Sequence, residues 1–298
     1  MSVKNMFLET RPQFLLLSPI LAFLGMSIAL YNGNFNALYF VLTIIGLTLL
    51  HASVNTLNDY TDFRTGVDLK TNKTPFSGGS GFLPAGLLKP STALKIGLGS
   101  IILATPIGIY FLLERGTQLL PLFIVGAILV LFYTSFITRL GLGLAEISAG
   151  LGLGALPVIG VFMIINGKFT YAALYASMPS FFLVFNLLLL NEIPDAVADR
   201  EGRRKTLPIQ FGLREAAVIY STLTMATYAW ILAGAVLKLM PYWSLIALLT
   251  LPVGLKAVRG ALTFKKPEEL VPAQGANVIT VLLTQLLLGL GYLLAWIV

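Results

Sequence analysis

The run FLLLSPILAFLGMSIALY, residues 14–31, has eighteen residues and no charged side chain. An apolar helix needs about 20 residues to cross the roughly 30 Å hydrocarbon core of a bilayer. Lys4 and Arg11-Pro12 precede the run, but no small-residue cleavage site followed by a soluble domain comes after it. We therefore expect a first transmembrane helix that is retained.

The rest of the chain has the same apolar character. Of its 298 residues 57% are hydrophobic and only 11% are charged, and the mean hydropathy is +0.86, which is outside the range of soluble domains. We expect an all-α polytopic membrane protein with one domain over residues 1–298, in which nine transmembrane helices surround a central cavity. Polar segments at about 57–91 and 192–214 are expected as cap loops. The nine expected spans are 14–31, 36–56, 92–113, 118–137, 144–166, 171–191, 215–237, 242–259 and 273–297.

Basic residues support this count, because lysine and arginine gather in cytoplasmic loops. The N-terminus and the loops after the second, fourth, sixth and eighth spans contain 17 of the 20 basic residues. The N-terminus and both cap loops are therefore expected in the cytoplasm, and the C-terminus outside. Orientation signals and an anionic substrate account for the net charge of +7, so no nucleic-acid partner is expected. No obligatory protein partner is evident either.

Two polar segments follow the second and sixth apolar runs. The first is Asn55-Thr-Leu-Asn-Asp-Tyr-Thr-Asp62 with Asp68 after it, and the second is Asn191-Glu-Ile-Pro-Asp-Ala-Val-Ala-Asp199. Carboxylates are costly at membrane depth, so an apolar chain that keeps two sets of them is expected to use them. Helical capping or loop salt bridges would explain one aspartate, but five aspartates in two patterned sets favour function.

Helical spacing turns each segment into an oxygen-lined surface. In the first segment, steps of three and four residues put the polar side chains on one face about 100° wide. In the second, Asn191, Asp195 and Asp199 repeat every four residues, although Pro194 is a point where a helix kinks or ends. The candidate metal ligands are Asn58, Asp59, Asp62, Asp68, Asn191, Asp195 and Asp199.

Magnesium suits these ligands, since it takes oxygen atoms and is completed by substrate phosphates. The chain has no cysteine and one histidine, so a metal must be bound mainly through oxygen. The predicted ligand is therefore a diphosphate bound through magnesium. Basic residues, which also bind diphosphates, follow each acidic segment. They are Arg64, Lys70 and Lys73 after the first, and Arg200, Arg203, Arg204 and Lys205 after the second.

Several single residues allow more than one interpretation. His51 lies one turn before Asn55 and either packs through a hydrogen bond, assists proton transfer or lines the cavity; packing is favoured. Glu146 either orients a neighbouring base or caps a helix. Tyr133 is a candidate to stabilise a cationic intermediate through its ring or to donate to phosphate, although tyrosines are also common at membrane interfaces. The glycine-rich segment 78–86 can approach a ligand with its backbone amides and is expected to cover the substrate.

These motifs resemble those of a known family. Asn58-Asp-Tyr-Thr-Asp-Phe-Arg-Thr-Gly-Val-Asp68 and Asp195-Ala-Val-Ala-Asp-Arg-Glu-Gly202 are similar to the paired aspartate motifs of the UbiA superfamily of intramembrane aromatic prenyltransferases. The resemblance extends to Arg11-Pro12, Tyr133-Thr134 and Lys205-Thr206-Leu207. The five-residue gap between Asp62 and Asp68, with the glycine-rich segment, is closest to the 1,4-dihydroxy-2-naphthoate prenyltransferases of the menaquinone branch.

The resemblance implies a chemistry that agrees with the site. Two Mg²⁺ ions would bind a polyprenyl diphosphate, the allylic C–O bond would ionise, and an aromatic acceptor would attack the carbocation. The implied catalytic residues are Asp62, Asp68, Asp195, Asp199 and Tyr133. The implied diphosphate-binding residues are Arg11, Asn55, Arg64, Lys70, Lys73, Arg139 and Lys205.

Other functions remain as alternatives. Within the superfamily, the acceptor could be 4-hydroxybenzoate or geranylgeranylglyceryl phosphate. A secondary transporter also keeps aspartates near broken helices, but its binding site lies near the bilayer midplane, whereas these motifs fall at span ends among basic residues. A CDP-alcohol phosphotransferase would need a compact glycine-containing aspartate motif, which the sequence lacks.

Overall fold

The computed structural model describes residues 2–71 and 73–298, and it contains only helices and connecting turns in that part of the chain. The helices are α1 (Val3–Glu9), α2 (Pro12–Leu15), α3 (Leu17–Tyr31), α4 (Ala37–Thr65), α5 (Pro90–Arg115), α6 (Leu120–Phe132), α7 (Leu144–Gly150), α8 (Leu156–Asn166), α9 (Tyr171–Glu201), α10 (Leu207–Phe211), α11 (Leu213–Val236), α12 (Leu251–Thr263) and α13 (Val271–Ile297). Short segments of tighter or wider helix lie at Thr117–Leu119, Ile137–Arg139, Leu151–Ala155, Tyr242–Thr250 and Pro267–Leu270.

The long helices confirm a polytopic membrane protein. Eight helical stretches among the described residues are long and apolar enough to cross a bilayer: Pro12–Tyr31, Ala37–Thr65, Pro90–Arg115, Leu144–Asn166, Tyr171–Glu201, Leu213–Val236, Tyr242–Thr263 and Pro267–Ile297. A shorter apolar helix, Thr117–Phe132, lies where the fourth of the nine spans was expected. The expected count of nine is therefore approximate by length alone.

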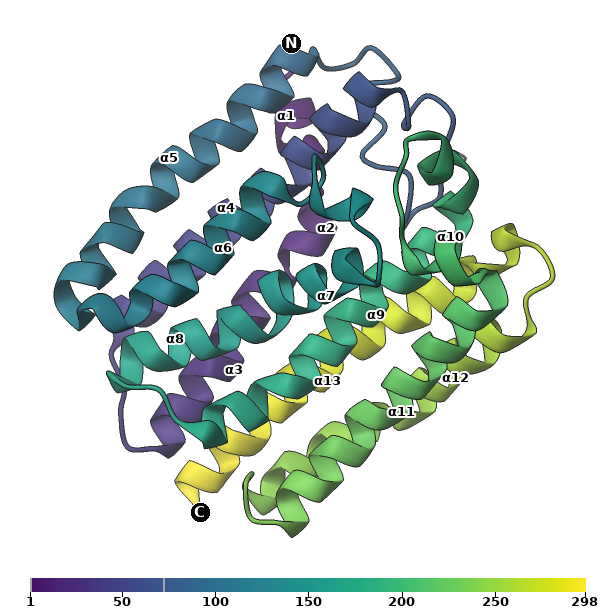
Figure 1. Ribbon diagram of the computed structural model, residues 1–298. Coiled ribbons are helices and arrows are strands. Elements are labelled where there is room, and N and C mark those ends of the chain that lie inside the picture. Colours follow the sequence, from purple (N-terminus) through teal and green to yellow (C-terminus); the bar gives the residue numbers. More distant parts are fainter. Residues whose placement is uncertain (1, 72) are drawn as a thin grey trace.

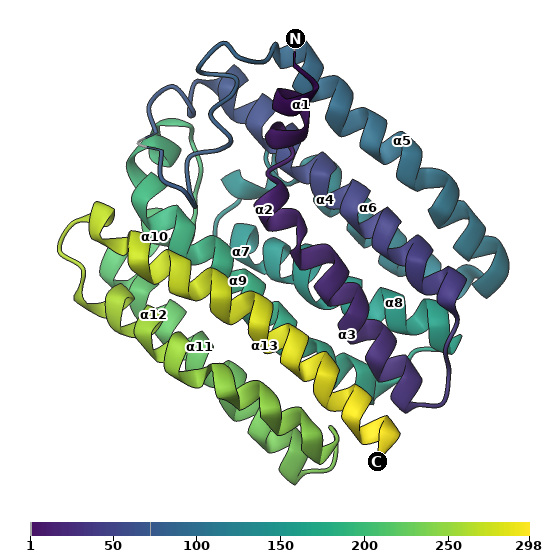
Figure 2. The ribbon, with the colours of Figure 1, turned by 180° about the vertical axis from the view of Figure 1, so that it is seen from behind.

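The positions of the two chain ends also limit the number of spans. Helix α1 lies at one end of the bundle and the C-terminal end of α13 at the other, in both views (Figures 1 and 2). Termini at opposite ends of the bundle require an odd number of helical stretches that run along its length. Counting the short stretch Thr117–Phe132 with the eight longer ones satisfies this requirement.

Helices α4 and α9, which contain the acidic segments, run beyond the expected spans. Asn36 caps the start of α4 by accepting from Tyr39 N at 3.0 Å, and the helix ends only at Gly66, whose φ of 80° suits glycine. Helix α9 continues through Pro194 to Glu201. The expected cap boundaries at 57 and 192 therefore fall inside helices, because neither the polar side chains nor the proline ends them.

The packed centre of the bundle lies around α3, α8, α9 and α13, where Leu24, Phe162 and Leu183 are buried. The outer helices expose apolar side chains. Ile102 of α5 is 68% exposed, and no residue of α6 is buried. Exposed apolar surface of this kind suits contact with lipid.

Candidate functional site

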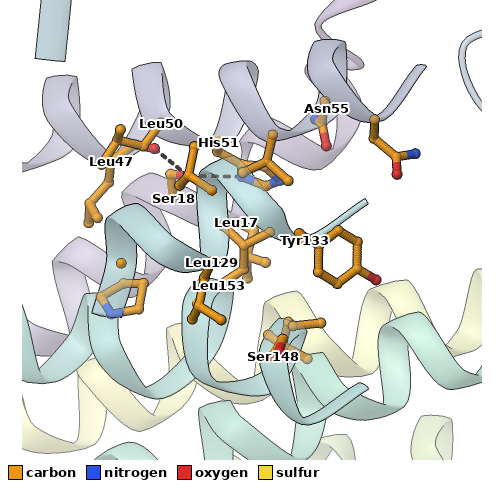
Figure 3. A pocket seen from close by; sticks show the side chains of 18 of the residues that line it. Leu17, Ser18, Leu47, Leu50, His51, Asn55, Leu129, Tyr133, Ser148 and Leu153 are labelled. Carbon is orange, nitrogen blue, oxygen red and sulfur yellow. Dashed lines mark hydrogen bonds between the residues drawn. The ribbon is translucent and has the colours of Figure 1, made fainter. Parts of the chain in front are cut away.

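A cavity of about 590 Å³ lies between the α2–α3 stretch, α4, α5, α6, the α7–α8 stretch and α9. Apolar residues such as Leu42, Ile107, Leu122 and Leu188 form most of its wall. One end is polar, and both acidic segments contribute to it (Figure 3 shows part of the wall). The polar end is lined by Asn55, Asn58, Asp62, Asp68, Asn191, Glu192, Asp195, Asp199 and Arg204.

The first acidic segment reaches the cavity from the last turns of α4. Asn58 Nδ2 donates to Asp62 Oδ2 at 3.1 Å, and Thr134 Oγ1 donates to Asn58 Oδ1 at 2.8 Å. Asn55 Nδ2 donates to Thr10 O at 2.9 Å. These bonds fix the orientation of the side chains on the face that the helical spacing predicted.

The second acidic segment meets the first through Arg204. Its Nη1 donates to Asp199 Oδ1 at 2.8 Å, and its Nη2 donates to Asp62 Oδ1. Burial lowers the pKa of Arg204, but the nearby charges of Asp62 and Asp199 outweigh this effect and raise its pKa. One guanidinium thus joins carboxylates from α4 and α9.

The glycine-rich loop covers the acidic end of the cavity. Gly78 N donates to Asp195 Oδ2 at 3.1 Å. Gly79 has a φ of 67°, and an added Cβ there would come within 3.1 Å of Asp68 Oδ1 and 3.2 Å of Asp59 Oδ1. Glycine is therefore required for this close approach of the backbone to the carboxylates. The loop therefore lies against the acidic side chains at this end of the cavity.

Asp59 contacts this loop and does not line the cavity. Its Oδ2 accepts from Ser80 N at 2.8 Å, and Ser80 Oγ donates to the buried Glu9 at 2.6 Å. Lys73 Nζ donates to the carbonyl of Ser80. Burial, followed by the charge of Asp59, raises the pKa of Glu9 to about 7. Ser80 therefore anchors the loop to both α1 and α4.

The acidic end of the cavity has the chemistry of a cation site. Asp68 Oδ2 and Asp195 Oδ1 are buried and have no hydrogen-bond partner in the described part of the chain. Burial and the charges of Asp62 and Asp59 raise the pKa of Asp68 to about 8. No three acidic or histidine side chains of the described residues lie close enough together to hold a metal ion by themselves. Mg²⁺ takes few protein ligands, so phosphate oxygens of a substrate would have to complete its coordination here.

Five of the predicted cationic residues lie outside the cavity wall. Arg64, Lys70, Lys73, Arg139 and Lys205 do not line it, and all five are exposed. Lys70 pairs instead with the exposed Glu201 at 2.5 Å, and the backbone of Lys205 donates to Thr138 O at 2.8 Å. Arg11 does line the cavity. Cations near the motifs in sequence therefore point mostly to solvent.

The residues left open by the sequence have defined contacts. His51 lines the cavity and its Nδ1 lies 3.0 Å from Ser18 Oγ (Figure 3). Tyr133 also lines the cavity, and in the view of Figure 3 it appears between Asn55 and Ser148. Glu146 Oε1 accepts from Leu207 N at 2.6 Å, so it caps the start of α10.

Sequence reasoning missed two parts of this site. In the sequence, Arg204 is one of four basic residues after the second motif, and nothing distinguishes it from the other three. In the structure, the turn after α9 directs its side chain to the acidic residues. There Arg203 has a φ of 62° and Arg204 N donates to Asp199 O at 3.0 Å, which turns the chain back toward the cavity. Glu192 lines the cavity, and its Oε2 has no hydrogen-bond partner among the residues that the structure describes. Its place beside Asn191 was the available signal.

An apolar bundle with an acid-lined cavity at one end defines an integral membrane protein whose site suits a metal-bound anion. The profile of the UbiA prenyltransferase family matches residues 16–273, so the chain belongs to this family of prenyltransferases. The family expected from the two aspartate motifs is confirmed.

Two relatives with assigned functions match over nearly the whole chain. The 1,4-dihydroxy-2-naphthoate octaprenyltransferase of Bacillus subtilis (strain 168) is 25% identical over 288 residues, covering 96% of this chain and 91% of that protein. The protein of the same name from Escherichia coli (strain K12) is 25% identical over 292 residues, covering 96% and 94%. The chain is thus similar to the menaquinone branch, as its motif spacing indicated.

Solved structures share the fold. A UbiA homologue from Aeropyrum pernix K1 has a TM-score of 0.72 at 16% identity and covers 94% of this chain and 97% of its own. A UbiA homologue from Archaeoglobus fulgidus bound to DMAPP and Mg²⁺ has a TM-score of 0.68 at 14% identity and covers 97% and 98%. At these identities the likeness supports the fold alone.

Proposed function

We propose that this chain transfers a polyprenyl group from its diphosphate to 1,4-dihydroxy-2-naphthoate in the membrane. One observation carries the proposal. Asp62, on α4, and Asp199, on α9, pair with the same guanidinium at the polar end of an apolar cavity. A substrate with an ionic head and a hydrocarbon tail matches both ends. The names of the two relatives from Bacillus subtilis and Escherichia coli support the choice of acceptor.

The proposed metal ligands are the acidic and amide side chains that face the cavity. They are Asn58, Asp62 and Asp68 on one side, and Asn191, Asp195 and Asp199 on the other. The unpartnered Asp68 Oδ2 and Asp195 Oδ1 fit this role, and two sides suit two Mg²⁺ ions. Bound Mg²⁺ would neutralise the diphosphate as a leaving group.

The diphosphate would leave with the electrons of the allylic C–O bond, and an allylic carbocation would remain. Gly78 and Gly79 cover the acidic end of the cavity and would exclude water from it. Tyr133 lines the wall beside this end, where its ring can stabilise a cation. Arg11 also lines the cavity and is the proposed cationic contact of the diphosphate.

The acceptor ring supplies the electrons for the new bond. The ring carbon that bears the carboxylate would attack the carbocation, forming a C–C bond. Loss of that carboxylate as carbon dioxide then restores the aromatic ring. The apolar wall would hold the tail, whose length the cavity limits.

The site is proposed to face the cytoplasm, with the C-terminus outside. Most basic residues follow the even-numbered spans, and the acidic ends of α4 and α9 lie at the end of the bundle that also contains α1 (Figure 1).

The test is an assay of purified protein in lipid with Mg²⁺ and radiolabelled geranylgeranyl diphosphate. The acceptors are 1,4-dihydroxy-2-naphthoate, 4-hydroxybenzoate and geranylgeranylglyceryl phosphate, each tested separately. Prenylation of the naphthoate alone supports the proposal. Product from another acceptor instead would reassign the substrate, and no product with any acceptor would refute prenyl transfer.

A further inference from the structure

Arg204 connects the two acidic segments through both of its terminal nitrogen atoms. Asp62 and Asp199 come from different helices, and each pairs with a different nitrogen of the guanidinium. Both carboxylates are buried, with side-chain exposures of 7% and 2%, and the Arg204 side chain is only 14% exposed. Two buried carboxylates this close to one cation would repel each other without it.

The bridge is built into the local fold. The backbone N–H of Arg204 donates to Asp199 O at 3.0 Å, while the side chain donates to the carboxylate of the same residue. The left-handed conformation of Arg203 makes the turn that allows both contacts. The planar fork of arginine can span two carboxylates, whereas a lysine ammonium is a point charge.

The same carboxylates are also the proposed metal ligands. A cation bound by Asp62 and Asp199 needs the oxygen atoms to which the guanidinium donates. Arg204 and a divalent metal therefore compete for these oxygen atoms. Arg204 lines the cavity, so after losing these bonds its side chain remains beside the proposed diphosphate.

We propose that Arg204 is a positioning residue whose guanidinium holds Asp62 and Asp199 together, and that a bound metal ion displaces it from these two carboxylates. The inference rests on the proposed metal-dependent function. Arg204 weakens the binding of metal alone, and it stabilises the fold when divalent cations are scarce.

The experiment measures Mg²⁺ binding rather than turnover. The full-length chain is purified in detergent and freed of metal with EDTA. MgCl₂ alone is then titrated by calorimetry, and melting is followed by tryptophan fluorescence with and without Mg²⁺. The variants are Arg204→Gln and Arg204→Lys. The matched control is Arg200→Gln, which removes the same charge from an exposed arginine nearby.

We expect Arg204→Gln to lower the Kd for Mg²⁺ by about tenfold or more, because a close competing charge is removed. This variant should melt below the wild type in EDTA and recover in saturating Mg²⁺. Arg204→Lys should lower the Kd by about threefold, because it keeps the charge but not the fork. Arg200→Gln should match the wild type.

An unchanged or higher Kd in Arg204→Gln would overturn the proposal. If that variant does not fold, an unchanged or higher Kd in Arg204→Lys would overturn it as well. A different result would implicate the proposed function itself: if Mg²⁺ binds neither the wild type nor any variant, the metal site is wrong and the role of Arg204 falls with it.

Discussion

Glu9 is a buried carboxyl that should make the stability of this protein depend on pH. Its pKa is raised from 4.5 to about 7, mainly by burial and then by the charge of Asp59. The folded state therefore binds the proton more tightly than the unfolded state does. Stability contributed by the neutral form is complete below the unfolded pKa and is lost as the pH rises through the folded pKa.

The size of this effect follows from the shift. One pKa unit corresponds to about 1.4 kcal/mol, so the free energy of unfolding should fall by roughly 2–3 kcal/mol from pH ~5 to pH ~8 through Glu9 alone. Replacing Glu9 with glutamine removes the titration. The buried amide also costs stability, but it does so equally at every pH. The difference in slope between the two proteins is therefore the quantity to compare.

The assay is unfolding by SDS in mixed micelles at a series of pH values, followed by tryptophan fluorescence. We expect the wild type to lose roughly 2–3 kcal/mol more than Glu9→Gln over this range. Glu201→Gln is the matched control, because Glu201 is exposed and pairs only with the exposed Lys70 among the described contacts. Equal slopes in the wild type and Glu9→Gln would refute the reasoning.

Other substitutions test the packing and the surface charges. Gly154→Ala should destabilise the protein by about 1–3 kcal/mol, since its Cβ would lie 2.5 Å from the carbonyl of Ser180, and overpacking has this cost. Gly99→Ala, in open space on α5, should stabilise by about 0.5–1 kcal/mol, and SDS unfolding of the pair measures the contrast. Lys70→Ala should change stability by less than about 1 kcal/mol, because its ion pair is exposed. Prenyl transfer by Lys70→Ala should equal that of the wild type; a large loss would place Lys70 in the site.

Much of the fold can be predicted from the sequence, because membrane-spanning helices consist of long apolar runs. The run at 14–31 lies within the first membrane stretch, and the runs at 144–166 and 171–191 also lie on helices. The stretch Thr117–Phe132 is shorter than its expected span because the chain leaves the helix at Tyr133 and turns through Ile137–Arg139.

The cavity face of the site was only partly predictable. Helical spacing puts Asn55, Asn58, Asp59 and Asp62 on one face, and the structure keeps three of them in the cavity wall. Asp59 is turned to the glycine-rich loop, because Ser80 N returns over α4 and needs an acceptor. Periodicity within one helix cannot foresee the path of a loop that comes back to it.

The sequence was equally unable to predict which basic residues reach the acidic site. Charge near an acidic motif predicts that some basic side chain will meet it, but a long flexible side chain in a loop can point either way. Lys73 folds back onto the carbonyl of Ser80, whereas Arg204 reaches Asp62. The selection depends on the left-handed turn at Arg203, which no sequence pattern marked.

The central claim is that the acidic side chains facing the cavity carry out Mg²⁺-dependent prenyl transfer. The most direct measurement is the rate of transfer by Asp195→Asn beside Glu201→Gln, both on α9, with Mg²⁺ and with EDTA. We predict that EDTA stops the wild type, that Asp195→Asn lowers kcat by about 100-fold or more, and that Glu201→Gln keeps the wild-type rate. A folded Asp195→Asn protein that turns over at the wild-type rate would contradict the account.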